Sequence, residues 1–547
     1  MVELTGTPNN GSGVLAPENA VRILNGTRIA ALADIDEAPF GWLHFRVSLV
    51  AGAGFFTDAY DIFAISIAST MLGYVYGTGC DPNPNNCHLN DNLGLGIKVA
   101  MPVGNLFGQL FFGWLADLVG RKRMYGIELM IIIVATLSQA TAGYVPGVIN
   151  MFAVIIFWRF VMGVGVGGDH PLSAVISSEF ASASSRGRLM TAVFANQGWG
   201  QLTASLVAMC IVRGYKNTLQ QDVLSAEALI SIDKMWRLLI GLGCVPGAIA
   251  LYFRLTIPET PRFIMDVMRD VNQAALDIDN LLTLHTYHVD PDAVVQRVRA
   301  PLATRSDFVV YFSQWRNLRQ LIGASYSWFA LDIAFYAIQL NTDILLQKIK
   351  FAVLKQTSLY ARLYNFCVGN IVFSVGGLIP GYWATFIFID IWGRRPIQLM
   401  GFIMLTILFI VMGSGYKAMN KTARGTNAFM FLTCLTNFFF NFGPNTTTFI
   451  VPGEAFPTRY RSTSHGIAAA SGKLGAVISQ VGFARLANKG GPDGQYAWLP
   501  YVLLILAFFM LTGVFSTLLI KETKQRTLED ISNESQEGFV LGLVGRV

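Results

Sequence analysis

Asp117-Leu-Val-Gly-Arg-Lys-Arg123 lies in a short polar loop between two apolar runs, and Asp390-Ile-Trp-Gly-Arg-Arg395 lies in a similar loop in the second half of the chain. A second matched pair follows in the same order, Glu179-Phe-Ala-Ser-Ala-Ser-Ser-Arg-Gly-Arg188 and Glu454-Ala-Phe-Pro-Thr-Arg-Tyr-Arg461. Two signals that recur at corresponding positions predict that the chain is built from two parallel repeats.

The composition indicates an integral membrane protein. Of 547 residues, 53% are hydrophobic and only 14% are charged, whereas soluble domains carry about 25% charged residues. A helix needs roughly 20 apolar residues to cross a bilayer, and runs of that length are too long for barrel strands. Twelve such runs occur, near residues 46–73, 94–116, 124–146, 150–179, 188–212, 234–256, 320–341, 366–389, 397–416, 427–451, 463–485 and 498–520. We therefore expect an all-α membrane protein whose twelve transmembrane helices form two six-helix pseudo-repeats.

A charged stretch separates the two repeats. We expect an N-terminal segment 1–43, a six-helix half 44–257, a central loop 258–319, a second six-helix half 320–520 and a tail 521–547. Lys and Arg gather in the loops of the first half and in the central loop, which places these loops and both termini in the cytoplasm by the positive-inside rule. These topology signals account for the net charge of +6, so we expect a lipid bilayer and no nucleic acid as partner.

Five ionisable side chains fall near the middle of predicted helices. Asp58 and Asp61 are one turn apart, which predicts that they share a helix face. Asp169, Asp332 and Lys473 each stand singly in an apolar run. Exposing all five to lipid would cost about 10–15 kcal/mol, so they must face one another or water. Such residues mark functional sites in membrane proteins.

Neutral hydrogen-bonding groups accompany these charges. Trp328, Asp332 and Tyr336 recur at intervals of four residues and stack in one stripe of the seventh predicted helix. Because Asp332 and Lys473 have opposite charge at similar depth, we expect them to pair when no substrate is bound. Further candidates embedded in predicted helices are Gln197, Asn441, Glu128 and Arg159; whether the last two touch does not follow from the sequence.

The charged helix ends predict a second kind of site. Glu179 and Glu454 lie beside basic loops, which favours a salt-bridge cluster that gates the chamber over contact with substrate. The other loop charges of this expected gate are Asp117, Arg121, Asp390 and Arg394. On the opposite side, Cys80 and Cys87 bracket a polar loop, where a disulfide is plausible in an oxidising compartment.

The repeated loops, Pro258-Glu-Thr-Pro-Arg262 and Glu522-Thr-Lys-Gln-Arg-Thr-Leu-Glu529 resemble the major facilitator superfamily near its sugar-porter-like branch. Within it, Gly167-Gly-Asp-His-Pro-Leu-Ser-Ala-Val-Ile-Ser-Ser-Glu179 is similar to the signature of fungal and plant phosphate:proton symporters. The resemblance covers roughly residues 40–520 and implies uptake of inorganic phosphate driven by protons across the plasma membrane.

The resemblance also implies residue roles. Proton transfer would fall to Asp58 and Asp61, with Glu128 and Arg159 as accessories. The phosphate pocket would be lined by Asp169, Gln197, Trp328, Asp332, Tyr336, Asn441 and Lys473. The family usually has tyrosine where this chain has His170, whose imidazole can still donate a hydrogen bond to phosphate but titrates near neutrality.

Phosphate chemistry fits these residue types independently of the family. A phosphate ion offers several strong acceptor oxygens, which call for donors such as ammonium, phenol, indole and amide groups. Two other functions stay open: uptake of a phosphate ester such as a glycerophosphodiester, and a receptor that binds phosphate without transporting it. The sequence has no P-loop and no G-x-S-x-G elbow, and its six histidines form no metal-ligand motif, so we expect no enzyme, no cofactor and no metal. A channel is disfavoured because its filter needs rings or closely spaced repeats of such groups.

Overall fold

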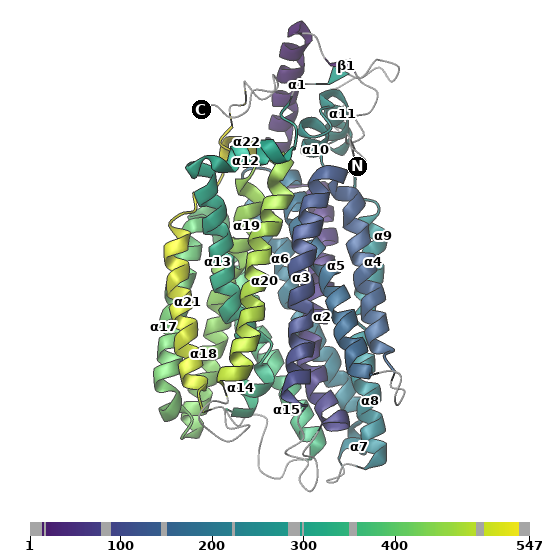
Figure 1. Cartoon of the computed structure of the whole chain (residues 1–547), viewed down its shortest axis with the longest axis vertical. Coiled ribbons are helices and arrows are strands. Elements are labelled where there is room, and N and C mark those ends of the chain that lie inside the picture. The colour runs from purple at the N-terminus through teal and green to yellow at the C-terminus, as the bar shows by residue number, and fades with distance from the viewer. Residues whose placement is uncertain are drawn as a thin grey trace, which may run out of the picture.

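The structure is a computed structural model, and almost all of its regular structure is helical (Figure 1). It describes residues 14–15, 18–77, 89–143, 150–220, 225–282, 296–297, 300–348, 358–487, 497–534 and 536. One two-residue parallel pair, β1 (Val14–Leu15) with β2 (Gln296–Arg297), joins the N-terminal segment to the central stretch.

Ten helical spans among the described residues are long and apolar enough to cross a membrane. They are built from α2 (Trp42–Tyr76), α3 (Asp91–Val119), α4 (Arg121–Ala140), α5 (Met151–Phe180), α8 (Ala226–Gly241) with α9 (Cys244–Arg254), α13 (Trp315–Gln339), α15 (Leu359–Phe373) with η2 (Ser374–Leu378) and α16 (Ile379–Trp392), α17 (Arg394–Met419), η3 (Thr458–Tyr460) with α20 (Arg461–Leu486), and α21 (Leu499–Thr517).

Two further spans complete the expected twelve. The helix α6 (Arg186–Gly214) carries several amides and arginines, which lower its hydropathy. The other span is broken at Gly443 into α18 (Ala423–Asn441) and α19 (Pro444–Ala455), because Pro444 cannot continue the hydrogen bonding of the first piece. The polar positions that weaken the hydropathy signal in these two spans include the candidate residues Gln197 and Asn441.

Short helices cover one end of the bundle, which we call the α1 end (Figure 1). They are α1 (Glu18–Glu37), α10 (Pro261–Asp266), α11 (Val271–Leu282), α12 (Arg305–Ser313) and α22 (Leu528–Ile531). Leu32 and Ile35 of α1 pack on Ile278 of α11. The sequence predicted no helices here, because none of these segments has an apolar run of membrane length. The opposite end, with α7 (Lys216–Leu219) and α14 (Thr342–Lys348), is the α14 end.

Small residues set how closely the long helices approach. A Cβ at Gly104 or Gly108 of α3 would collide with the backbone of α5, and a Cβ at Gly163 or Gly167 of α5 would collide with α3. The two halves meet in the same way where α3 packs on α20, with Gly466 against the backbone of α3. Such small-residue packing is the usual way in which membrane helices come into close contact.

Candidate functional site

The mid-span charges are all buried inside the bundle. Asp58, Asp61, Asp169, Asp332 and Lys473 are each at most 5% exposed. None of them faces the lipid, in agreement with the cost of exposing charge to hydrocarbon. They fall into a cationic cluster in the second half and an acidic cluster in the first half.

The cationic cluster is centred on Lys473 of α20. Its ammonium donates to Asp332 Oδ2 over 2.8 Å and to Tyr336 Oη over 3.0 Å, both on α13. Gly472 leaves room for this arrangement, because a Cβ there would overlap the ring of Trp328. The Asp332–Lys473 pair expected from the sequence is therefore present, with Trp328 and Tyr336 on the same side of α13.

The acidic cluster is organised by a residue that the sequence did not single out. Arg254, at the end of α9, donates to Glu128 Oε1 of α4 and to Asp169 Oδ2 of α5, each over 2.7 Å. Asp169 also accepts from Ser173 Oγ over 2.6 Å. Glu128 thus pairs with Arg254 and not with Arg159. In sequence, Arg254 follows an apolar run and is typical of an interfacial arginine, so nothing marked it as buried.

Asp58 and Asp61 have different partners although they are one turn apart. The Asp58 carboxyl lies within electrostatic range of Asp169 and of Arg254. Asp61 instead accepts from Thr136 Oγ1 of α4 over 2.8 Å and lies within electrostatic range of Arg159. Arg159 donates to the carbonyl of Ile97 over 2.8 Å.

A belt of amides joins the two halves beside these clusters. Tyr382 of α16 donates to Gln197 Oε1 of α6 over 2.7 Å and accepts from Asn445 Nδ2 over 3.1 Å. Asn445 donates in turn to Asn441 Oδ1 over 2.7 Å. Tyr382 is the second residue that sequence reasoning missed, because one tyrosine in an aromatic-rich run carries no periodic signal.

An aromatic layer lies on the α1 side of these polar groups. The rings of Phe194 and Phe449 stack with centroids 4.5 Å apart, and Phe55 packs edge-on against both. His170 contacts the edge of Phe55, with centroids 5.1 Å apart, and its Nδ1 lies 3.0 Å from the carbonyl oxygen of Val166. His465, which the sequence analysis overlooked, packs edge-on against Trp328 and Phe449. This layer takes rings from both halves of the chain.

The two clusters lie close enough to interact electrostatically. His170 lies within electrostatic range of Lys473 and of Asp169, and Tyr336 lies within range of Asp58. A proton or an anion bound at one cluster therefore changes the potential at the other.

Beyond the aromatic layer, ion pairs tie the two halves together at the α1 end. Asp117 accepts from the backbone N–H groups of Ser462 and Thr463, over 3.2 and 2.7 Å. Glu179 accepts from Arg461 over 2.7 Å and lies 3.4 Å from Arg121. The predicted gate residues of the first half thus all contact one another or the second half.

The second half repeats this arrangement. Asp390 accepts from Arg394 over 2.8 Å and from the backbone N–H of Arg188 in the first half over 2.9 Å. Arg394 also binds Glu454 through two nitrogens, over 3.0 and 2.6 Å. Each of the six side chains predicted for the gate therefore makes an ion pair or a hydrogen bond at this end.

Two glycines and two glutamates explain the repeated loop motif. Gly120 and Gly393 have φ of 112° and 100°, which favours glycine. Each precedes a helix whose first N–H groups need acceptors. Glu259 accepts from the N–H groups of Arg121 and Lys122, and Glu522 accepts from those of Arg394 and Arg395. Both glutamates lie in the motifs quoted above, although their capping role was not predicted.

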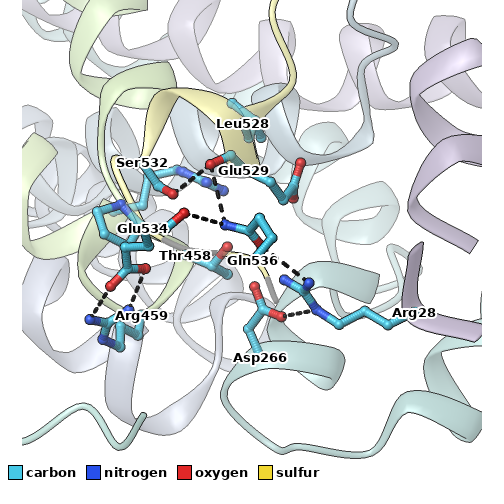
Figure 2. Close-up of a pocket in the computed structure, with 11 residues that line it drawn as sticks. Arg28, Asp266, Thr458, Arg459, Leu528, Glu529, Ser532, Glu534 and Gln536 are labelled. Carbon is cyan, nitrogen blue, oxygen red and sulfur yellow. Dashed lines mark hydrogen bonds and ion pairs between the residues drawn. The ribbon is translucent and has the colours of Figure 1, made fainter. Parts of the chain in front are cut away.

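A third layer of charges links the tail to the bundle, as Figure 2 shows. Arg459 binds Glu534 of the tail through two nitrogens and Asp307 of α12 through a third. Arg28 of α1 binds Asp266 of α10. Arg28, Asp266, Arg459 and Glu534 line a cavity of about 10 Å³, which is room for about one water molecule.

Contacts between the halves also close the α14 end. Ser66 and Thr342 hydroxyls lie 3.1 Å apart, and Lys98 donates to Asn341 over 3.1 Å and lies 3.4 Å from Asp343. The two halves therefore contact each other at both ends of the bundle. Cys80 and Cys87 lie outside the described residues.

Among the residues that the structure describes, no group of three or more His, Cys, Asp or Glu side chains converges as metal ligands do.

Comparison with known proteins places this architecture among membrane transporters. The family described as "Sugar (and other) transporter" matches residues 47–534. A repressible high-affinity phosphate permease of Neurospora crassa is 47% identical over 524 residues, covering 93% of this chain and 90% of the relative. An inorganic phosphate transporter of Saccharomyces cerevisiae is 46% identical over 527 residues, covering 92% and 87%. One from Oryza sativa subsp. japonica is 37% identical over 523 residues, covering 93% and 97%.

Solved structures of the major facilitator superfamily share the fold. A proton:xylose symporter bound to 6-bromo-6-deoxy-D-glucose superposes with a TM-score of 0.67 at 20% identity, covering 89% of this chain and 98% of the symporter. A xylose transporter of E. coli in a partially occluded inward open conformation gives a TM-score of 0.64 at 18% identity, covering 88% and 99%. At these identities the likeness establishes the fold alone, a helical bundle of two six-helix halves.

Proposed function

Because this chain belongs to the sugar (and other) transporter family, we propose that it imports inorganic phosphate together with protons by alternating access. Relatives named as phosphate permeases or transporters match at least 92% of the chain, which supports phosphate as the substrate. The observation that carries the proposal is Lys473, a buried ammonium held by Asp332 and Tyr336 inside the bundle.

Phosphate would replace Asp332 as the partner of Lys473. A buried cation that exchanges one anionic partner for another stays compensated, whereas a permanent ion pair would leave no site for the substrate. Tyr336 Oη already accepts a hydrogen bond from the ammonium, and its O–H can donate to a phosphate oxygen. The proposed lining is completed by Trp328, Gln197, Asn441, Asp169 and His170.

Protons would enter through the acidic cluster. We assign proton coupling to Asp58 and Asp61, with Glu128 and Arg159 in supporting roles. A proton taken up with phosphate lowers the negative charge that must cross the low-dielectric chamber, which gives the coupling its physical basis. Each ligand then favours the binding of the other.

Alternating access would open one end at a time. Opening the α1 end must break the cross-half contacts of Asp117 with Thr463 and of Glu179 with Arg461, and must part the aromatic layer. The Lys and Arg content of the α1-end loops supports an orientation with this end in the cytoplasm of a plasma-membrane protein. Both termini would then be cytoplasmic, and the segment boundaries given above would separate the halves from the loops. The same residues supply no catalytic apparatus, so the proposal is a carrier and not an enzyme.

Uptake into proteoliposomes tests the function. Radiolabelled phosphate should accumulate when the outside is made acidic, and excess unlabelled phosphate should abolish the signal. A signal abolished by a glycerophosphodiester and not by phosphate would favour the ester as substrate. Phosphate binding without any accumulation would favour a receptor.

A further inference from the structure

Lys98 of α3 forms an ion pair across the two halves at the α14 end. Its ammonium donates to Asn341 Oδ1 over 3.1 Å and lies 3.4 Å from Asp343 Oδ2, and both partners belong to the second half. The hydroxyls of Ser66 and Thr342 meet across the same boundary, 3.1 Å apart. The transport scheme above gives Lys98 no role beyond this contact.

The geometry of the pair is poor for a structural role. The two oxygens of Asp343 lie 3.4 and 3.5 Å from Lys98 Nζ, farther than the about 2.7–2.9 Å of a strong charge-assisted hydrogen bond. The two side chains are 12% and 17% exposed, and ion pairs that are loose and partly exposed contribute little to stability. Once the halves separate at this end, water reaches the ammonium, so losing Asp343 does not leave a dry, uncompensated charge.

Lys98 has the same kinds of partner as Lys473, but they come from a different part of the molecule. Each ammonium contacts one carboxylate and one neutral oxygen. The partners of Lys473 lie in its own half, so that pair can persist when the halves move. The partners of Lys98 lie in the opposite half, so the movement that opens the α14 end itself withdraws Asp343. The ammonium therefore has no acidic partner when this end is open.

Buried amides lie between this outer pair and the central site. Asn341 Nδ2 donates to Gln480 Oε1 over 3.3 Å, and Gln480 Nε2 donates to the backbone carbonyl of Tyr336 over 2.7 Å. The Tyr336 hydroxyl in turn accepts from Lys473 over 3.0 Å. The segment between the two lysines therefore carries groups that can form hydrogen bonds with an anion.

We propose that Lys98 is an entry site for phosphate, which binds its ammonium in place of Asp343 while the α14 end is open and then moves on to Lys473. Ser66, in the same half as Lys98, loses Thr342 in the same movement and can donate its hydroxyl to the anion. When the halves close again, Asp343 returns to the ammonium, and its negative charge disfavours phosphate there. This inference rests on the proposed function, because it takes the α14 end as the side from which phosphate enters.

Uptake kinetics of two variants separate an entry site from a structural pair, because Lys98→Gln and Asp343→Asn both break the contact. We expect Lys98→Gln to raise the KM for phosphate about tenfold or more, the effect of losing a hydrogen bond to a charged group. Asp343→Asn should leave the KM unchanged or lower it, because the ammonium then has no competing acid. The same change of KM in both variants would overturn the proposal.

Arg485→Gln is the matched control for these kinetics. Arg485 is an exposed cation at the same end and also contacts the other half, at Asn92 over 3.3 Å. Its replacement removes the same charge and a contact between the halves, and the KM should stay at the wild-type value. A KM raised as much as in Lys98→Gln would show a general effect of surface charge and would overturn the specific site.

Chemical labelling tests phosphate binding at Lys98 without relying on transport. An amine-acetylating reagent is applied to the purified protein, and mass spectrometry of its peptides measures the rate at each lysine. Inorganic phosphate should slow the acetylation of Lys98 severalfold and leave that of the exposed Lys417 unchanged. Equal rates at Lys98 with and without phosphate would overturn the entry site.

The variant Lys473→Ala separates the two sites in the same assay. Protection of Lys98 should persist in it, because the entry site does not need the central cation. Loss of protection would show that phosphate at the central site shields Lys98 indirectly, which overturns the proposal. A wild type that accumulates no phosphate would contradict the proposed function, while the labelling of Lys98 would still decide the entry site.

Discussion

Replacing Lys473 by alanine removes a buried cation and leaves both of its partners in place. The ammonium lies 2.8 Å from Asp332 Oδ2 and 3.0 Å from Tyr336 Oη, and the Lys473 side chain is 3% exposed. Removing one partner of a buried pair costs about 3–5 kcal/mol, because the remaining charge is uncompensated. We therefore expect Lys473→Ala to lower the free energy of unfolding by about that amount until Asp332 takes up a proton.

The same change should remove phosphate binding. Loss of one buried, hydrogen-bonded charge costs a complex at least about 2 kcal/mol, which is a factor of roughly 30 in Kd. Equilibrium binding of radiolabelled phosphate in detergent measures the affinity, and thermal unfolding of the same sample measures the stability. Both readouts are needed, because a destabilised protein also loses binding.

A neutral double variant separates the two effects. Lys473→Met combined with Asp332→Asn removes the ion pair without leaving an unpaired charge, so its Tm should return toward the wild-type value. Phosphate binding should still be absent, since the cation that attracts the anion is missing. Recovery of binding together with stability would refute the assignment of Lys473 to the substrate and would make the pair a structural one.

Three further changes test other parts of the account. Asp61→Asn should abolish proton-driven uptake and spare some phosphate binding; normal uptake would remove Asp61 from the coupling. Glu522→Ala leaves the first N–H groups of α17 without their acceptor, so thermal unfolding should show a loss of about 0.5–2 kcal/mol, as for other helix caps; an unchanged Tm would argue against the capping role. Burial raises the pKa of the Glu529 carboxyl, but Arg262 outweighs it and holds the pKa at about 2, below the ordinary 4.5. The ionised group therefore stabilises tail docking above pH 4.5, and this stabilisation is lost as the pH falls toward 2. Limited proteolysis should show the tail protected at neutral pH and cleaved at about pH 2; equal protection at both would contradict the contact.

The fold was predictable because a membrane span has a length requirement that few other structures share. Twelve apolar runs and two repeated loops were enough to predict two six-helix halves. The burial of the mid-span charges was predictable for a related reason. Exposing Asp332 or Lys473 to lipid is costly, so each side chain must face the interior and find a partner there. Their opposite charge and similar depth then indicated the pair.

The other residues of the site could not be predicted, because their roles depend on contacts between segments that are far apart in the sequence. Arg254 follows an apolar run and has the pattern of an interfacial arginine, yet α9 places it in the bundle beside Glu128 and Asp169. Tyr382 connects the halves because α16 happens to face α6, a neighbour relation between distant segments. The helices of the α1 end escaped prediction because they are short and have no run of membrane length.

A high-resolution structure of the protein with phosphate bound is the most direct test. The account predicts a phosphate oxygen at about 3 Å from Lys473 Nζ, a normal distance for a charge-assisted hydrogen bond, with Asp332 displaced from the ammonium. Phosphate bound elsewhere, with the contact between Lys473 and Asp332 unchanged, would contradict it.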